Sequence, residues 1–183
     1  MGLSTRNGIE VTGKLKDYVV FDFETTGVRA NCDKIIEIGA VKVRDHEIVD
    51  RYSQLINPEC HIPAGASNVN GIYDYMVCDK PVIYDAISDF IEFIGDDILI
   101  GHNIATFDMK FLYRDIERIY EEPYNKLDNR YLDTLKMARR KLNLKNNKLT
   151  DLAEYFGISS TGAHRALADV EMNMRIYEEL CKK

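Results

Sequence analysis

The chain has 183 residues, enough for one domain with a hydrophobic core, and nothing in its composition indicates a second domain. Its 24 basic and 30 acidic residues give a net charge of −6, which argues against a protein that grips duplex DNA through a broad basic face. No apolar run is long enough to cross a bilayer, and no signal-peptide pattern is present. The four cysteines are scattered, as is typical of free thiols in a reducing compartment, so we expect a cytoplasmic protein with no membrane partner.

The first half of the chain predicts three strands. Residues 1–15 are polar and lack periodicity, so we expect a tail or linker remnant before a domain over residues 16–183. Residues 18–23 predict a buried strand, and two alternating segments hinged near residues 45–46 predict a hairpin. The segment "PECHIPAGASNVNGIYDYMV" is rich in Gly, Asn and Pro, and we expect a long irregular connection there.

The second half alternates helices with short strands. Helical periodicity predicts helices over residues 81–94, 105–120, 134–141, 149–156 and 165–180, and the segments "DILIG" and "NRYLDTL" predict short strands. This order of elements predicts an α/β fold, in which a mixed five-stranded sheet with an antiparallel hairpin is flanked by helices.

Two carboxylates interrupt the apolar pattern at the end of the first strand. Asp22 and Glu24 are two residues apart, so they project from the same face, about 6.6 Å apart along the strand. At an effective dielectric constant of about 20, two such charges repel by roughly 2–3 kcal/mol. The two acids either face solvent at the strand end or bind a hard divalent cation.

Two later acids stand near element ends. Asp108 occupies the apolar stripe of its helix, although an acid in a first turn also complements the helix dipole. Asp169 falls in the first turns of the last helix, and His164 lies five residues earlier. Five residues span about 500° of a helix, so both can serve one site only if His164 lies in the preceding loop. Alone, each of these two residues is more often a surface group.

Together, the four acids favour a metal site. Converging carboxylates could not all stay ionised in one pocket without cations, and two divalent ions would leave coordination positions open for a phosphate. This arrangement is typical of two-metal phosphodiester hydrolysis.

The segments "FDFETTG", "GHNIATFD", "YLDTL" and "HRALAD" resemble, in order and spacing, the motifs of the DEDDh 3′–5′ exonucleases. The resemblance covers about residues 18–180, and a His five residues before the last Asp matches the histidine type of this family. It implies a ribonuclease H-like fold and hydrolysis of nucleotides from the 3′ ends of single-stranded DNA in proofreading or repair. A DNA polymerase is an implied partner.

The resemblance also implies a role for each matching residue. The four acids Asp22, Glu24, Asp108 and Asp169 would hold two Mg²⁺ or Mn²⁺ ions, and His164 would accept a proton from the attacking water. An unperturbed imidazole, with a pKa of about 6.5, suits that role near neutral pH. The positions implied to contact the terminal nucleotide are Thr25, Thr26, Gly27, Asn70 and Phe107. At Asn70 this sequence departs from a common family form, which has His.

Two other functions remain open from the sequence. The same chemistry would serve a 3′–5′ exoribonuclease that trims RNA or short oligonucleotides. A function of a different class is a module that binds 3′ ends without cutting them. The presence of all four acids and His164 argues against this alternative. By the same resemblance, Asp133 in "YLDTL" matches an additional acid of the family, which implies a structural or outer-shell role rather than that of a ligand.

Overall fold

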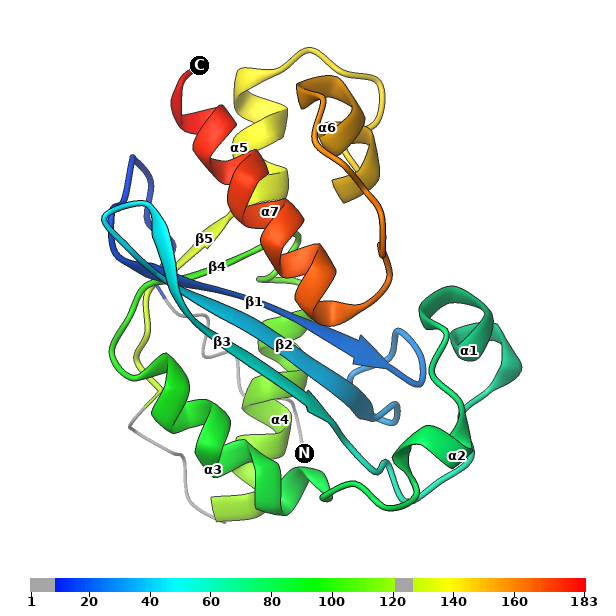
Figure 1. The fold of residues 1–183 in the computed structure, drawn as a ribbon. Helices are drawn as coiled ribbons and strands as arrows, with labels where there is room; N and C mark the ends of the chain where they lie inside the picture. Colours follow the sequence, from blue (N-terminus) through cyan, green and yellow to red (C-terminus); the bar gives the residue numbers. More distant parts are fainter. Residues whose placement is uncertain (1–8, 121–126) are drawn as a thin grey trace.

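The computed structural model describes residues 9–120 and 127–183. Its centre is a five-stranded sheet with the order β3-β2-β1-β4-β5 (Figure 1). The strands are β1 (Tyr18–Thr25), β2 (Ile35–Arg44), β3 (Glu47–Leu55), β4 (Leu99–Gly101) and β5 (Tyr131–Asp133). β2 pairs antiparallel with β1 and β3, whereas β4 runs parallel to both β1 and β5. The predicted mixed sheet with an antiparallel hairpin is confirmed.

Helices cover both faces of the sheet. They are α1 (Ala64–Asn70), α2 (Asp74–Val77), α3 (Ile83–Ile94), α4 (Asp108–Tyr120), α5 (Thr134–Lys141), α6 (Leu149–Phe156) and α7 (Ala166–Cys181). Figure 1 shows α3 and α4 on one face, α5, α6 and α7 on the other, and α1 and α2 beyond the end of β1. Among the described residues, no helix has the length and apolar character that a bilayer crossing requires.

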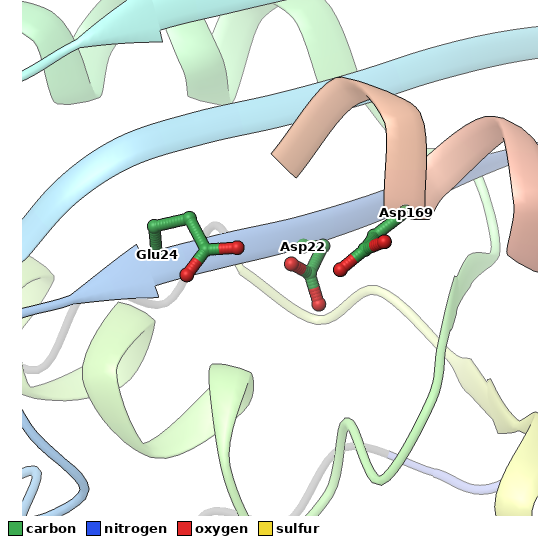
Figure 2. A group of neighbouring side chains, drawn as sticks. All are labelled: Asp22, Glu24 and Asp169. Carbon is green, nitrogen blue, oxygen red and sulfur yellow. The ribbon is translucent and has the colours of Figure 1, made fainter. Parts of the chain in front are cut away.

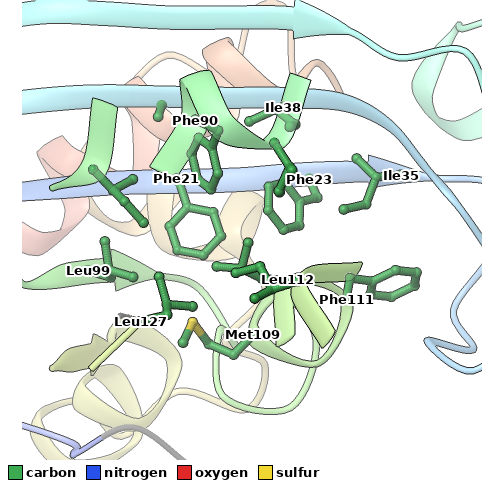
Figure 3. Packing of buried hydrophobic residues seen from close by; sticks show 14 of the residues in the cluster. Phe21, Phe23, Ile35, Ile38, Phe90, Leu99, Met109, Phe111, Leu112 and Leu127 are labelled. Atoms are coloured by element: carbon green, nitrogen blue, oxygen red, sulfur yellow. The ribbon is translucent and has the colours of Figure 1, made fainter. Parts of the chain in front are cut away.

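Alternation along β1 decides which residues face each helical layer. Phe21 and Phe23 pack against the α3–α4 layer, where Phe90 and Leu112 meet them (Figure 3). Tyr18 and Val20 project to the opposite face and pack in the cluster formed with α5, α6 and α7. Because successive side chains alternate, Asp22 and Glu24 continue the row of Tyr18 and Val20. The two acids therefore face the α7 side of the sheet.

The connection between β3 and α3 differs from the prediction. Residues 58–77 were expected to be irregular, but this segment contains the short helices α1 and α2. Ile62, Ile72 and Val77 are buried against Ile36 of β2, so burial of a few apolar side chains supports these helices. Elements of one or two turns have no extended periodicity, which is why the sequence pattern did not reveal them.

Two predicted helix starts were early. α3 begins at Ile83 rather than residue 81, because the Pro81 carbonyl accepts a hydrogen bond from the Asn57 N–H in an extended pairing. α4 begins at Asp108 rather than residue 105, because the Asn103 carbonyl accepts the N–H groups of Thr106 and Phe107 in a preceding turn.

The described residues before β1 contact the domain. The Val11 N–H donates to the Tyr131 carbonyl at 2.7 Å, and the Leu15 N–H donates to the Tyr177 hydroxyl at 2.7 Å. The division of the chain at residue 16 stays a prediction.

The close approach of α7 to β2 depends on Gly39. A Cβ atom at this glycine would lie 2.5 Å from the Ala166 carbonyl carbon and 2.5 Å from the Leu167 nitrogen. Gly39 also pairs directly with Asp22 of β1. The missing side chain therefore lets the first turn of α7 rest on the sheet beside Asp22.

We predict that Gly39→Ala lowers the free energy of unfolding by roughly 1–3 kcal/mol, because the added methyl group meets backbone atoms that cannot yield without moving α7. Thermal unfolding measures the effect. Gly65→Ala in α1 is the matched control, because nothing lies within 4 Å of its added Cβ, and it should stabilise by up to about 1 kcal/mol. Equal melting temperatures for the two variants would contradict the steric account.

Candidate active site

Three carboxylates converge where β1 meets α7. Asp22 and Glu24 project from β1, and Asp169 projects from the first turn of α7 (Figure 2). Each residue offers one oxygen, and these oxygens lie within 4.8 Å of one another. All three residues are partly buried. This spacing would allow a cation to lie between the three carboxylate oxygens.

Asp108 stands beside this group rather than within it. It is the first residue of α4, is 1% exposed, and its Oδ1 accepts the Phe23 N–H at 3.2 Å. Burial raises the pKa of Asp22 well above its ordinary value, and the charge of Asp108 is the next largest cause, ahead of Glu24. The fourth acid therefore acts on Asp22 from the α4 side.

The site keeps protons when no cation is present. Burial raises the pKa of Glu24 to about 8, with further increases from Asp169 and Glu37, while a hydrogen bond from Asn70 opposes the rise. Burial likewise raises the pKa of Asp108 to about 7, although the backbone hydrogen bonds that its carboxylate accepts lower this pKa. An acid keeps its proton at neutral pH when its surroundings do not stabilise the ionised, negatively charged form. A divalent cation fits this donor set, because hard cations prefer carboxylate oxygens.

Glu37 is a site residue that the sequence reasoning missed. It is 2% exposed, lies directly opposite Glu24 across the β1–β2 pair, and binds the Arg165 guanidinium through both of its oxygens at 2.7 and 3.1 Å. Its Oε2 also accepts the Ala166 N–H at 3.0 Å. Glu37 therefore anchors the start of α7, and with it Asp169. Its interruption of the apolar run "IIEIGAV" was the available signal.

His164 lies in the loop before α7, where a shared site requires it. Its φ of +67° is in the left-handed region, and its backbone N–H donates to the two Asp169 oxygens at 3.3 and 3.2 Å. The residue is exposed. This arrangement holds the histidine backbone against one of the clustered carboxylates and leaves the imidazole open to solvent.

The loop after β1 is closed by its own hydrogen bonds. The Thr26 N–H donates to the Lys34 carbonyl at 2.8 Å, and the Lys34 N–H donates to the Thr26 hydroxyl at 2.9 Å. The Thr25 hydroxyl donates to the Gly27 carbonyl at 2.7 Å. A Cβ atom at Gly27 would lie 2.6 Å from the Asp33 carboxylate, so a larger residue there would displace this side chain, which accepts the Arg29 N–H. The backbone beside Glu24 is thus held in one conformation.

Asn70 and Phe107, the two other predicted nucleotide contacts, lie in different environments. Asn70 ends α1, is 4% exposed, and hydrogen-bonds to Glu24 as well as accepting the Ile72 N–H at 3.0 Å. Phe107 directly precedes Asp108, is partly buried, and its ring centroid lies 5.1 Å from that of Phe111. Asn70 therefore contacts the acid cluster, whereas the Phe107 ring packs against Phe111 of α4.

Asp133 has a structural environment. Its Oδ1 accepts the N–H groups of Asn103 and Leu135, each at 3.0 Å, and so caps α5 and ties it to the loop before α4.

A strand end with clustered, partly buried carboxylates, set in a mixed sheet between two helical layers, defines a candidate metal-dependent phosphodiester hydrolase. The family model for RNase T, described as exonuclease, matches residues 19–177. The chain belongs to this exonuclease family, and the predicted class of enzyme is confirmed.

The chain is also similar to one part of much longer proteins. It is 43% identical to the DNA polymerase III PolC-type of Oceanobacillus iheyensis over 84% of this chain and 11% of that protein. It is 42% identical to the DNA polymerase III PolC-type of Bacillus subtilis over 90% of this chain and 11% of that protein. The chain thus spans about a tenth of the length of these relatives.

Solved structures confirm the predicted fold. Exonuclease X, in complex with 5′ overhanging duplex DNA, is similar with a TM-score of 0.71 and 26% identity, over 90% of this chain and 91% of that chain. E. coli exonuclease I, in complex with a dT13 oligonucleotide, has a TM-score of 0.78 at 19% identity, over 90% of this chain and 41% of that chain.

The raised pKa of Glu24 predicts how pH changes stability without metal. Between about pH 5 and pH 8 the folded state keeps a proton that the unfolded state has released, so the free energy of unfolding falls as pH rises. A cation replaces that proton, and we expect Mn²⁺ to raise the melting temperature more at about pH 8.5 than at about pH 5.5. Thermal unfolding with EDTA or Mn²⁺ measures both effects. Glu24→Gln should weaken both, and an unchanged response in that variant would contradict the assignment.

Proposed function

We propose that this chain is a metal-dependent 3′–5′ exonuclease that removes nucleotides from the 3′ ends of single-stranded DNA. The observation that carries the proposal is the convergence of Asp22, Glu24 and Asp169, whose oxygens lie within 4.8 Å of one another. Asp108, at the start of α4, supplies a fourth acid beside these three.

In this proposal the four acids hold two divalent ions, Mg²⁺ or Mn²⁺. When bound, the ions supply charge neutralisation, orientation of the scissile phosphate and stabilisation of the leaving 3′ oxygen. Asp22 is central in this site. It lies close to Glu24 and Asp169, and the charge of Asp108 raises its pKa. The Phe23 N–H fixes the orientation of the Asp108 carboxylate.

His164 is the proposed general base. Its backbone bond to Asp169 places the residue at the acid cluster, and its exposed imidazole can accept a proton from the attacking water. The neutral form of an imidazole has the free nitrogen lone pair that this step needs.

The terminal nucleotide would lie between three elements around the acids. The loop of Thr25, Thr26 and Gly27, held closed by its internal hydrogen bonds, would line one side. Asn70 lines the α1 side, and Phe107 offers a ring for stacking against a base.

The relatives support a role with DNA. Both PolC-type proteins are DNA polymerases by name, so we propose proofreading or repair in the cytoplasm, with a polymerase as partner. RNA trimming remains the alternative within the same chemistry, and hydrolysis of matched DNA and RNA strands separates the two.

We predict that Asp22→Asn lowers exonuclease turnover by at least about 100-fold, because a neutral amide cannot hold a cation shared by several carboxylates. Release of mononucleotides from a 5′-labelled strand with Mn²⁺ measures the rate. Asp96→Asn, at an exposed position before β4, is the matched control and should behave as the wild type. Substantial hydrolysis by Asp22→Asn would remove Asp22 from the site. If the wild-type protein cut no strand but bound 3′ ends, the non-cutting module would replace the enzyme.

His164→Ala should lower kcat by about 10²–10⁴-fold with little change in KM, because it removes a proton acceptor and leaves the acids in place. Thr161→Ala, at an exposed position in the same loop, serves as control. A defect mainly in KM would instead make His164 a substrate contact.

A further inference from the structure

Exposed apolar side chains occur in two segments that the chain connects closely to Glu24, namely the loop after β1 and the segment that contains Asn70. Eight large hydrophobic residues are exposed within the part of the chain that the structure describes, and four belong to the segments that adjoin Glu24. These four are Val28, Val69, Tyr73 and Tyr75. The rings of Tyr73 and Tyr75 lie within 11° of parallel with their centroids 6.0 Å apart, and Tyr75 is 75% exposed. The two tyrosines thus form one exposed pair of stacked rings, which we call the tyrosine platform.

The platform is tied to the active site through Asn70. Asn70 hydrogen-bonds to Glu24, and Tyr73 follows Asn70 by three positions along the chain. Three residues of fully extended chain span at most about 11 Å. Because successive stacked nucleotides are about 3.4 Å apart, the platform lies within reach of the first few nucleotides of a strand held at the acids.

The base of the platform is firmly held. Ile72 and Val77, on either side of the two tyrosines, are buried against β2. The Asp74 carboxylate accepts the Ile62 N–H at 2.8 Å and contacts the His61 ring. The tyrosine rings therefore project from a fixed backbone without contributing to a hydrophobic core, so packing does not account for two aromatic residues at these positions.

The charge of the segment indicates which part of a strand it would contact. Residues 62–79 contain two aspartates and no lysine or arginine, and the whole chain has a net charge of −6. Phosphate groups find no basic partner on this segment. Aromatic rings stack on any base whatever its sequence, and the stacking does not need positive charge.

We propose that Tyr73 and Tyr75 stack on unpaired bases just upstream of the terminal nucleotide and so hold single-stranded substrate at the site. This inference rests on the proposed function. It names the feature that lets an acidic exonuclease bind a strand, and it predicts that a duplex end must first be unpaired to use the platform.

The test compares substrates that reach the platform with one that does not. The ratio of kcat/KM for a thymidine hexanucleotide to that for the p-nitrophenyl ester of thymidine 5′-monophosphate isolates contacts with upstream bases. Tyr73→Ala and Tyr75→Ala should each lower this ratio by about fivefold or more, mainly through KM for the hexanucleotide. Phenylalanine at either position should restore it, because the ring is kept. Tyr155→Ala, at an exposed tyrosine on α6, is the matched control and should leave the ratio unchanged.

A second assay does not depend on cleavage. An oligonucleotide with 2-aminopurine near its 3′ end should lose fluorescence on binding the Asp22→Asn protein, and the loss should shrink when both tyrosines become alanine. The proposal would be overturned if the double alanine variant kept both the wild-type ratio of kcat/KM values and the wild-type loss of fluorescence. If the wild-type protein cut no strand, the proposed function would fail, whereas the fluorescence assay would still support or overturn the platform.

Discussion

The contact between α7 and β2 is the constraint on which the rest of the structure depends. Gly39 leaves room for the backbone of Ala166 and Leu167, and Glu37, two residues away, binds Arg165 and the Ala166 N–H. These contacts hold the first turn of α7 on the sheet, so that an acid late in the chain meets two acids of β1. Without that approach Asp22 and Glu24 would be two carboxylates at an open strand end.

The same contact creates an electrostatic problem that a cation resolves. Burial and mutual repulsion keep protons on Glu24 and Asp108 near neutral pH, so the metal-free protein holds its acids in an unfavourable form. A divalent ion removes this cost and at the same time supplies the chemistry of phosphodiester hydrolysis. The net negative charge of the chain is compatible with this function, because the ions and exposed rings, rather than a basic surface, would hold the strand.

Much of this architecture follows from local patterns. Alternation along β1 places Asp22 and Glu24 on one face. The predicted hinge at residues 45–46 is the turn between β2 and β3, and both of its residues have positive φ. Local patterns could not predict contacts between residues that are distant in the sequence and meet only in the folded chain. The partners of Glu37 lie more than a hundred residues away, and the need for Gly39 is visible only against the backbone of α7. The helices α1 and α2 were missed because a few buried contacts, rather than periodicity, support them.

A crystal structure of the protein with Mn²⁺ and thymidine 5′-monophosphate would test the central claim most directly. Anomalous scattering locates the manganese without reference to the protein. The account predicts manganese bound by Asp22, Glu24 and Asp169, in contact with the nucleotide phosphate. Manganese and nucleotide bound elsewhere, with these three carboxylates uncoordinated, would contradict it.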